Sequence, residues 1–166
     1  MPGTPTALLF VCMGNICRSP TAEAVVKGLL RERGLERHVH VESAGTGGWH
    51  AGDPPDPRSV AAAAARGVTL DGAARQVTAT DFDRFDLLVA MDRENRDALL
   101  HLAPDDAARA KVRLLREFDP ASAARGDLDV PDPYYGGTDG FERVLDVVEA
   151  GARGLLDALR PAGRPA

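Results

Sequence analysis

Residues 7–20 read Ala7-Leu8-Leu9-Phe10-Val11-Cys12-Met13-Gly14-Asn15-Ile16-Cys17-Arg18-Ser19-Pro20. The first six residues form a short, continuous apolar run, which is typical of a strand buried on both faces of a parallel sheet. After a loop, Ser19 and Pro20 favour the start of a helix, because serine is a good N-cap and proline a good first helical residue. Apolar residues then recur at helical spacing as far as Gly34. The segment predicts a strand, a tight loop and a helix.

The rest of the chain repeats this alternation. Further strands are expected at Val39 and Val41, at Leu87–Met91 and at Val112–Leu115. Further helices are expected at about 58–66, after Asp92 as N-cap to Leu102, and from Phe141 to Leu159, whereas residues 119–130 are expected to be a loop. The alternation predicts one three-layer α/β domain over residues 1–166, with flexible tails at 1–6 and 161–166. Its core would be a four-stranded parallel sheet of the Rossmann-like or flavodoxin-like type, with helices on both faces.

Composition excludes several classes of function. The 166 residues are 44% apolar, which is enough for one core. The net charge of −5 argues against broad nucleic-acid binding, which requires clustered basic residues. No apolar run approaches the length of about 18 residues that a membrane span requires, and Met1 to Thr6 lacks the features of a signal peptide. We therefore expect a cytoplasmic monomer without membrane contact.

The two cysteines indicate local chemistry. Cys12 and Cys17 lie five positions apart, which cannot build a disulfide scaffold, and the four histidines show no paired spacing that would suggest a metal site. A loop between a strand end and a helix N-terminus directs backbone N–H groups at a common centre, where an oxyanion fits. Gly14 and Asn15 permit the backbone angles of such a loop. We expect no metal and no organic cofactor.

Cys12 and Arg18 give this loop its predicted chemistry. Arg18 offers a planar fork that matches two phosphoryl oxygens, and the helix N-terminus with this arginine stabilises a Cys12 thiolate over the thiol. Ser19 has two interpretations of equal weight. Its hydroxyl could donate to the Cys12 sulfur, or it could act as an N-cap alone.

The spacing Cys-x5-Arg by itself is weak evidence, but the string from Val11 to Pro20, between a strand and a helix, is far more specific. It resembles the signature loop of the low-molecular-weight protein tyrosine phosphatases, and the segment Gly47-Gly48-Trp49-His50 looks most like bacterial members. The resemblance extends in family order over nearly the whole chain: Ser43-Ala44-Gly45-Thr46, the segment through Trp49 to Asp53-Pro54-Pro55-Asp56, Ala74-Arg75-Gln76-Val77 and Asp132-Pro133-Tyr134-Tyr135-Gly136.

This resemblance implies a fold, an activity and a set of roles. The fold would be that of the phosphotyrosine protein phosphatases, and the activity would be hydrolysis of phosphotyrosine in proteins through a cysteinyl-phosphate on Cys12. Asp132 would be the general acid and Ser43 would help to hold Asn15. Cys17 would form a reversible disulfide with Cys12, although it could also be only a small buried apolar residue. Substrate binding would involve Met13, Gly14, Asn15, Ile16, Cys17, Trp49, Tyr134 and Tyr135.

The chemistry of Asp132 and of the aromatic residues agrees with two of these expectations. Phenolate is a poor leaving group until it is protonated, so a carboxyl group such as Asp132 above the phosphate loop supplies what arginine and N–H donors cannot. The single tryptophan, Trp49, and the only two tyrosines, Tyr134 and Tyr135, could line a deep cleft that accepts a phenyl ring. One of the tyrosines could instead simply pack the turn. Inorganic phosphate and vanadate are expected to inhibit competitively.

The chain departs from the family at one position, and three other functions are possible for such a loop. Gly72 stands where the family often has a histidine that braces the phosphate loop, which puts that support in doubt. A related arsenate reductase would require further cysteines downstream, and none follows Cys17. A protein-arginine phosphatase is associated with a threonine where this chain has Ile16. A catalytically silent phosphotyrosine-binding module could lack the nucleophile or the acid, whereas Cys12 and Asp132 are both present.

Overall fold

The computed structural model describes residues 5–133 and 139–159. Four parallel strands form one sheet in the order β2-β1-β3-β4: β1 (Thr6–Cys12), β2 (Val39–Gly45), β3 (Leu87–Ala90) and β4 (Val112–Leu114). The predicted parallel sheet is confirmed. Thr6 already pairs with Val39, so the strand begins at a residue that the sequence assigned to the N-terminal tail. Residues 1–4 and 160–166, as well as Tyr134 and Tyr135, lie outside the described residues.

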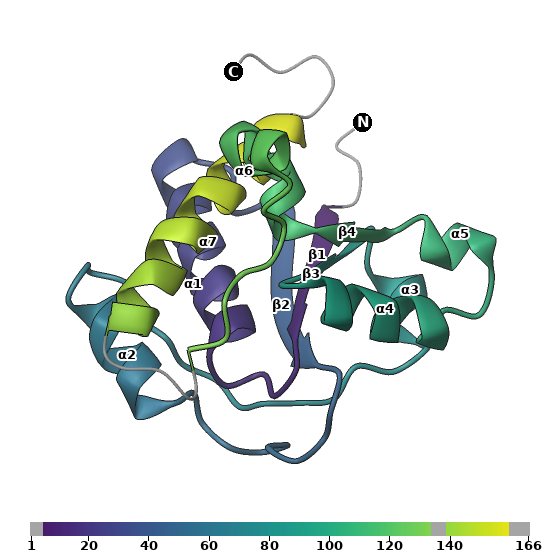
Figure 1. Ribbon diagram of the computed structural model, residues 1–166, viewed down its shortest axis with the longest axis horizontal. Coiled ribbons are helices and arrows are strands. Elements are labelled where there is room, and N and C mark those ends of the chain that lie inside the picture. Colours follow the sequence, from purple (N-terminus) through teal and green to yellow (C-terminus); the bar gives the residue numbers. More distant parts are fainter. Residues whose placement is uncertain (1–4, 134–138, 160–166) are drawn as a thin grey trace.

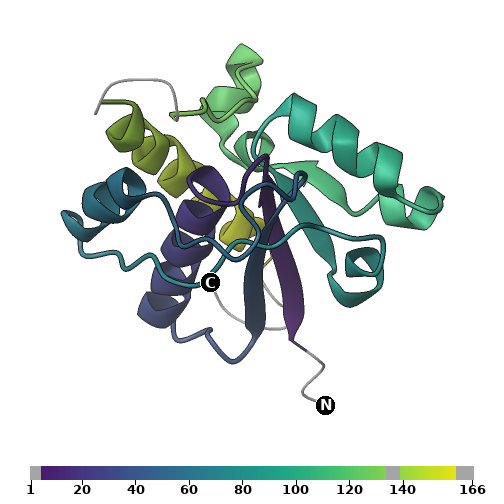
Figure 2. The ribbon, with the colours of Figure 1, turned by 90° about the horizontal axis from the view of Figure 1, so that it is seen from below.

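Helices cover both faces of the sheet (Figures 1 and 2). One face carries α1 (Arg18–Arg33), α2 (Pro57–Ala64) and α7 (Asp139–Ala158), and the other carries α3 (Asp81–Arg84), α4 (Arg93–Leu102) and α5 (Asp106–Arg109). Successive side chains of β1 point to opposite faces, so Leu8 and Phe10 pack in one core and Leu9 and Val11 in the other. The domain is therefore three layers with two cores. No helix within the described ranges is long and apolar enough to cross a membrane.

The strand order explains where a ligand would bind. The connection from β1 leads to β2 on one side, and the chain then crosses to β3 on the other side of β1. Ligands of such sheets bind at the carboxyl ends of the strands where the strand order reverses. That position is the end of β1, at Cys12.

Helix α1 begins earlier than its sequence predicts. Its first residue is Arg18, Cys17 occupies the N-cap position without a side-chain capping bond, and Pro20 lies third in the helix. Ser19 is therefore not an N-cap, and that interpretation is wrong. Proline is tolerated in the first turn, because the N–H groups there have no partner within the helix. The expected end of the helix is confirmed by Gly34, which has a φ of 67°.

The segment 119–130, predicted as a loop, contains a helix. Leu115–Phe118 forms the 3-10 helix η1, and Pro120–Arg125 forms α6, with Asp119 as N-cap and Gly126 in a left-handed conformation at its end. These are ordinary helix start and stop signals, but the composition, rich in alanine, glycine, aspartate and proline, obscured them. The predicted Asp92 cap of α4 is confirmed, since its carboxylate accepts the Asn95 N–H at 2.7 Å.

Candidate active site

The Cys12 thiol lies at the base of the loop that joins β1 to α1. It is 3% exposed, accepts a hydrogen bond from the Asn15 backbone N–H at 3.3 Å and lies 3.0 Å from the Ser19 hydroxyl. Asn15 has a φ of 58°, a left-handed conformation that asparagine adopts more readily than most residues. This conformation turns the Asn15 backbone N–H toward the sulfur.

Asn15 also supports the loop through its side chain. The amide nitrogen donates to the hydroxyls of Ser19 at 2.8 Å and Ser43 at 3.0 Å, and the amide oxygen accepts the Arg75 backbone N–H at 3.0 Å. Ser43 in turn donates to the Glu23 carboxylate at 2.6 Å. Asn15 is 4% exposed, so each of these bonds satisfies a buried polar atom. The expected contact between Ser43 and Asn15 is present.

Arg18 is buried at the first position of α1, with 3% of its side chain exposed. One guanidinium nitrogen, Nη1, donates to the Asp92 carboxylate at 2.6 Å and to the Val130 carbonyl at 3.0 Å. Burial by itself would lower the pKa of Arg18, but Cys12 and the carboxylates of Asp92 and Asp132 outweigh it and raise that pKa. The arginine is therefore a fixed cation beside the thiol.

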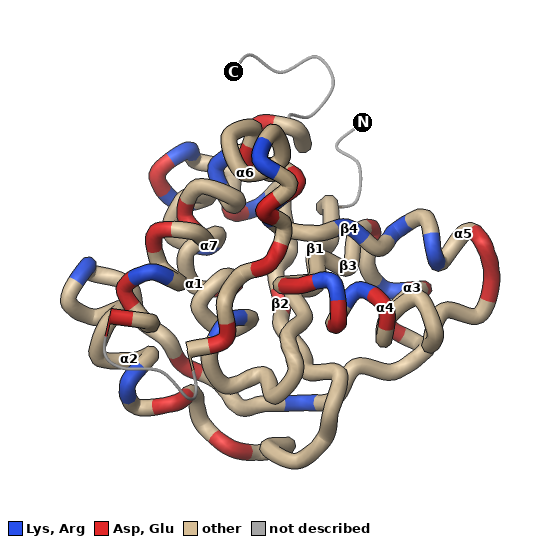
Figure 3. Tube along the Cα trace, viewed as in Figure 1, with Lys and Arg blue, Asp and Glu red and all other residues tan. Residues whose placement is uncertain are grey.

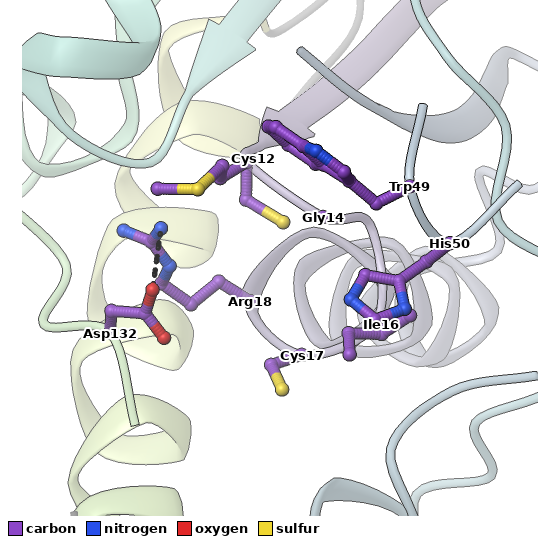
Figure 4. A pocket seen from close by; sticks show the side chains of 9 residues that line it. Cys12, Gly14, Ile16, Cys17, Arg18, Trp49, His50 and Asp132 are labelled. Carbon is purple, nitrogen blue, oxygen red and sulfur yellow. Dashed lines mark ion pairs between the residues drawn. The ribbon is translucent and has the colours of Figure 1, made fainter. Parts of the chain in front are cut away.

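Asp132 approaches this pair from the chain that follows β4 and α6. Its carboxylate lies 3.6 Å from the Arg18 Nη2 atom, and 38% of its side chain is exposed. Figure 4 shows the Arg18–Asp132 pair on one side of the Cys12 sulfur. The structure thus brings together Cys12, Arg18 and Asp132, which lie 120 positions apart from first to last in the sequence.

A cavity of about 300 Å³ opens over the thiol and is lined by Cys12, Met13, Gly14, Ile16, Cys17, Arg18, Trp49, His50 and Asp132. In Figure 4 the Trp49 ring lies on one side of the Cys12 sulfur and His50 on another. Trp49 is 73% exposed, so most of its indole faces solvent. Gly14 packs closely against His50, since a Cβ atom there would lie 3.0 Å from the His50 ring. Tyr134 and Tyr135, also expected to line this cleft, fall outside the described residues.

Cys17 is a buried thiol whose pKa is raised. Both cysteines are free and buried, and burial raises the pKa of Cys17 to about 12, with the nearby Asp56, Cys12 and Asp132 adding to the increase. A hydrogen bond with Ser59 opposes this shift. A reversible disulfide between Cys17 and Cys12 stays a prediction. At neutral pH almost all of Cys17 is the protonated thiol.

Several residues of the site were not predicted. Asp92 was expected only as a helix cap, yet its second oxygen orients Arg18. Glu23 and the Arg75 backbone complete the support of Asn15 through contacts that no local pattern reveals. Gly72 has a φ of 92° and lines a second cavity with Asn15 and Ser43, so no side chain at position 72 braces the loop. In the described part of the chain, no cluster of three or more His, Cys, Asp or Glu residues could hold a metal ion.

A thiol beneath an oxyanion-binding loop, with an arginine and a carboxylate beside it, defines the class of cysteine-dependent phosphatases. The family model of the low molecular weight phosphotyrosine protein phosphatases matches residues 7–164. The chain belongs to this family. A low molecular weight protein-tyrosine-phosphatase of Streptomyces coelicolor is 57% identical over 151 residues, which cover 91% of this chain and 92% of the relative.

Solved structures agree with this assignment. The crystal structure of YfkJ from Bacillus subtilis has a TM-score of 0.88 and 39% identity, covering 98% of this chain and 99% of that one. A protein tyrosine phosphatase of Entamoeba histolytica, solved with Hepes in the active site, has a TM-score of 0.87 and 39% identity, covering 93% and 96%. The similarity therefore extends over nearly the entire domain.

Proposed function

We propose that this protein hydrolyses phosphotyrosine monoesters in two steps, with Cys12 as nucleophile, Arg18 as phosphate clamp and Asp132 as general acid and then base. The observation that carries the proposal is the meeting of these three side chains at one cavity, with the Asn15 N–H and the Ser19 hydroxyl both on the Cys12 sulfur. Family membership supports the same activity.

In the first step the Cys12 thiolate attacks phosphorus, and the bond from phosphorus to the tyrosyl oxygen breaks. The loop N–H groups and the guanidinium of Arg18 hold the phosphoryl oxygens, and Asp132 gives its proton to the departing phenolate. The 3.6 Å separation of Asp132 from Arg18 keeps the acid beside the phosphate clamp. The product of this step is a cysteinyl-phosphate and a neutral phenol.

In the second step Asp132, now a carboxylate, accepts a proton from water that attacks phosphorus, and the Cys12 thiolate leaves. Ser19 assists its departure. The Ser19 oxygen accepts the Asn15 amide at 2.8 Å, so its single hydrogen can go either to the sulfur at 3.0 Å or to the Ala44 carbonyl at 3.3 Å. We infer that a thiolate draws the hydrogen to sulfur, because charge-assisted hydrogen bonds are the stronger ones.

The shape of the cavity favours an aryl phosphate. Met13, Ile16 and Trp49 give it apolar walls, and the thiol is 3% exposed at its base. A phenyl ring can span from such a base to the surface, whereas the short stem of phosphoserine would hold its backbone against the rim. Hepes, found in the active site of the Entamoeba relative, carries a sulfonate, an oxyanion similar in shape to phosphate.

Phosphotyrosine-containing proteins are the implied substrates of this family. We infer that the protein acts on them as a cytoplasmic monomer, and that inorganic phosphate and vanadate compete for the loop. Sedimentation equilibrium tests the oligomeric state, and cell fractionation tests the location. A dimer at micromolar concentration, or recovery in a membrane or exported fraction, would contradict these two points.

The decisive experiment measures phosphate release from phosphotyrosine and p-nitrophenyl phosphate, with a chelator and a thiol reductant present. We expect turnover by the wild type, none by Cys12→Ser, and a loss of about 10²-fold or more in Asp132→Ala. The matched control is Cys17→Ala, which removes the other thiol of the loop and should retain turnover.

Phosphoserine and phosphoarginine serve as comparison substrates. Preference for phosphoarginine would overturn the leaving-group assignment that rests on Ile16. Inactivity of fully reduced wild type with every substrate would favour a phosphotyrosine-binding module instead.

A further inference from the structure

Asp132 closely follows Val130, a buried residue that is held by two backbone hydrogen bonds. Val130, two residues earlier, is 1% exposed, donates its N–H to the Met91 carbonyl at 2.7 Å and accepts Arg18 Nη1 at its own carbonyl at 3.0 Å. Only Pro131 separates Val130 from Asp132, so a shift of Val130 moves the Asp132 backbone with it. The position of this carboxylate therefore depends on what fixes residues 127–130.

Arg116 is the side chain that fixes them from inside the protein. It lies in η1, is 4% exposed, and donates from Nη1 to the Asp129 carbonyl at 2.7 Å. The same nitrogen forms an ion pair with the Asp127 carboxylate at 3.0 Å. The Nε and Nη2 atoms donate to the Ser122 hydroxyl of α6 at 3.3 and 3.0 Å. One buried guanidinium thus joins η1, α6 and the segment that leads to Asp132.

The base to which Arg116 is attached is rigid. Its neighbour Leu115 is fully buried, and α7 packs so closely on η1 that a Cβ atom on Gly151 would lie 2.7 Å from the Leu115 side chain. Ser122 is 1% exposed and donates to the Asp119 carboxylate at 2.6 Å, which holds the far side of the guanidinium. Arg116 therefore fixes residues 127–130 relative to the hydrophobic core.

Two arginines with exposed side chains, in α4 and α6, also contact this segment. Figure 3 shows the acidic residues along the chain that leaves α6. Arg93 pairs with the Asp129 carboxylate at 3.1 Å, with 56% and 42% of the two side chains exposed, and its backbone N–H donates to the same carboxylate at 2.9 Å. Arg125 lies 4.0 Å from the Asp127 carboxylate, and 59% of its side chain is exposed. Exposed pairs of this kind hold geometry weakly, because water and salt screen them.

We propose that Arg116 is a positioning residue for the general acid: it holds the Asp129 carbonyl and Asp127, and through Val130 it keeps Asp132 at the leaving-group oxygen. This inference rests on the proposed role of Asp132. It gives Arg116 no contact with substrate. Its expected signature is a predominant loss of leaving-group protonation, because Arg18 shares the Val130 carbonyl but keeps its ion pair with Asp92 at 2.6 Å.

The test compares two aryl phosphates by kcat/KM, which reports the steps up to transfer of phosphate to Cys12. Phenol, with a pKa of about 10 like tyrosine, leaves only with help from the acid, whereas 2,4-dinitrophenolate leaves unaided. In Arg116→Met we expect kcat/KM to fall about tenfold or more for phenyl phosphate and less than about threefold for 2,4-dinitrophenyl phosphate. The reason is that a misplaced acid impairs only the protonation of the leaving group.

Controls separate this effect from unfolding. The initial burst of dinitrophenolate counts the folded, competent sites, so each rate is expressed per active site. Arg116→Lys keeps the charge but loses the planar fork, and it replaces Arg116→Met should that variant not fold. Arg125→Met removes an exposed arginine from the same Asp127 carboxylate and should change neither rate. Asp132→Asn removes the acid itself, so the difference between its losses of kcat/KM for the two substrates is the largest that an Arg116 variant should show.

The outcomes distinguish the two proposals. An equal loss with both substrates in Arg116→Met or Arg116→Lys, beside a selective loss in Asp132→Asn, would overturn the role of Arg116 and leave the acid assignment standing. The absence of any selectivity in Asp132→Asn would overturn the acid assignment and this inference with it. Selective loss in the Arg116 variants, with Arg125→Met unchanged, would support the positioning role.

Discussion

The Arg18 guanidinium is already held in one orientation in the absence of phosphate. Its Nη1 atom is already bonded to Asp92 and to the Val130 carbonyl, so the guanidinium cannot rotate about its bonds without losing two buried contacts. The conformational entropy of a free arginine is thus lost when the protein folds and not when substrate binds. On the proposed role of Arg18, Asp92 would contribute to phosphate affinity without touching phosphate.

The first prediction concerns Asp92→Asn. Asparagine caps a helix as well as aspartate does, so α4 should keep its N-cap while the ion pair to Arg18 at 2.6 Å becomes a neutral hydrogen bond. We expect kcat/KM for p-nitrophenyl phosphate to fall about tenfold and inhibition by phosphate to weaken similarly, from the loss of a charge-assisted bond. Asp97→Asn, on the exposed face of the same helix, is the matched control. Unchanged phosphate inhibition in Asp92→Asn would contradict the prediction.

The second prediction concerns Cys17 and pH. Because burial raises its pKa to about 12, the thiolate fraction of Cys17 should rise about tenfold for each pH unit between 7 and 9. After hydrogen peroxide converts Cys12 to a sulfenic acid, the Cys17 thiolate would attack its sulfur and displace hydroxide, forming a disulfide. Mass spectrometry of quenched samples should show disulfide formation accelerating with pH to the same degree.

Cys17→Ala is the control for this second prediction, since its Cys12 can only proceed to sulfinic acid under excess peroxide. A disulfide that forms at a rate independent of pH would show that Cys17 ionises more readily than its burial implies. Irreversible oxidation of the wild type at every pH would leave Cys17 as a buried apolar residue and end the proposed redox role.

At the scale of elements, the helices differ in how closely their glycines approach neighbouring elements. A Cβ atom on Gly28 of α1 would find only the end of the Arg31 side chain, at 3.8 Å. A Cβ atom on Gly154 of α7 would lie 1.9 Å from the Phe118 carbonyl oxygen, which belongs to the η1 backbone. Gly154 therefore allows the close approach of α7 to η1, the element that carries Arg116.

The third prediction compares these two glycines. Gly28→Ala should raise the free energy of unfolding by up to about 1 kcal/mol, because alanine favours helix more than glycine does. Gly154→Ala should lower it by about 1–3 kcal/mol, since α7 and η1 must separate to admit the methyl group. Urea unfolding followed by circular dichroism measures both changes. A stabilised Gly154→Ala variant would mean that η1 moves aside without cost.

At the scale of the whole molecule, the phosphate loop draws its contacts from across the fold. Asn15 is held by Ser43 of β2 and by the Arg75 backbone, and Arg18 by Asp92 before α4 and by Val130 after α6. An oxyanion bound at this loop therefore interacts only with the assembled domain. A ligand that binds the native state and not the unfolded chain must stabilise the native state by mass action.

The fourth prediction follows from this coupling. Inorganic phosphate at about 100 times its Kd should stabilise the protein by about 2.7 kcal/mol, which corresponds to a rise in Tm of several degrees for a domain of this size. Arg18→Met should abolish the rise. Sulfate at equal ionic strength and chloride serve as the oxyanion and salt controls in differential scanning calorimetry. An equal rise with chloride would indicate a salt effect in place of binding at the loop.

Local sequence signals determined most of the strands and helix ends of this protein and the form of its phosphate loop. The apolar run before Cys12, the cap at Asp92 and the stop at Gly34 are local signals, and each produced the predicted strand or helix boundary in the structure. The loop residues from Cys12 to Arg18 are also adjacent in sequence, so their common centre followed from one strand end and one helix start. The cap signal failed at Ser19, whose hydroxyl lies against the Cys12 sulfur. At 119–130 the local signals of a helix were present, at Asp119, Pro120 and Gly126, but the composition obscured them.

Only the tertiary structure decided how distant side chains act on that loop. The partners of Arg18 and Asn15, the burial that raises the pKa of Cys17, and the place of Arg116 beneath the Asp132 segment all join residues that are far apart in sequence. A sequence pattern reports spacing along one chain, whereas hydrogen bonds and desolvation depend on distances in space. Those distances exist only when the two cores have packed on either side of the sheet.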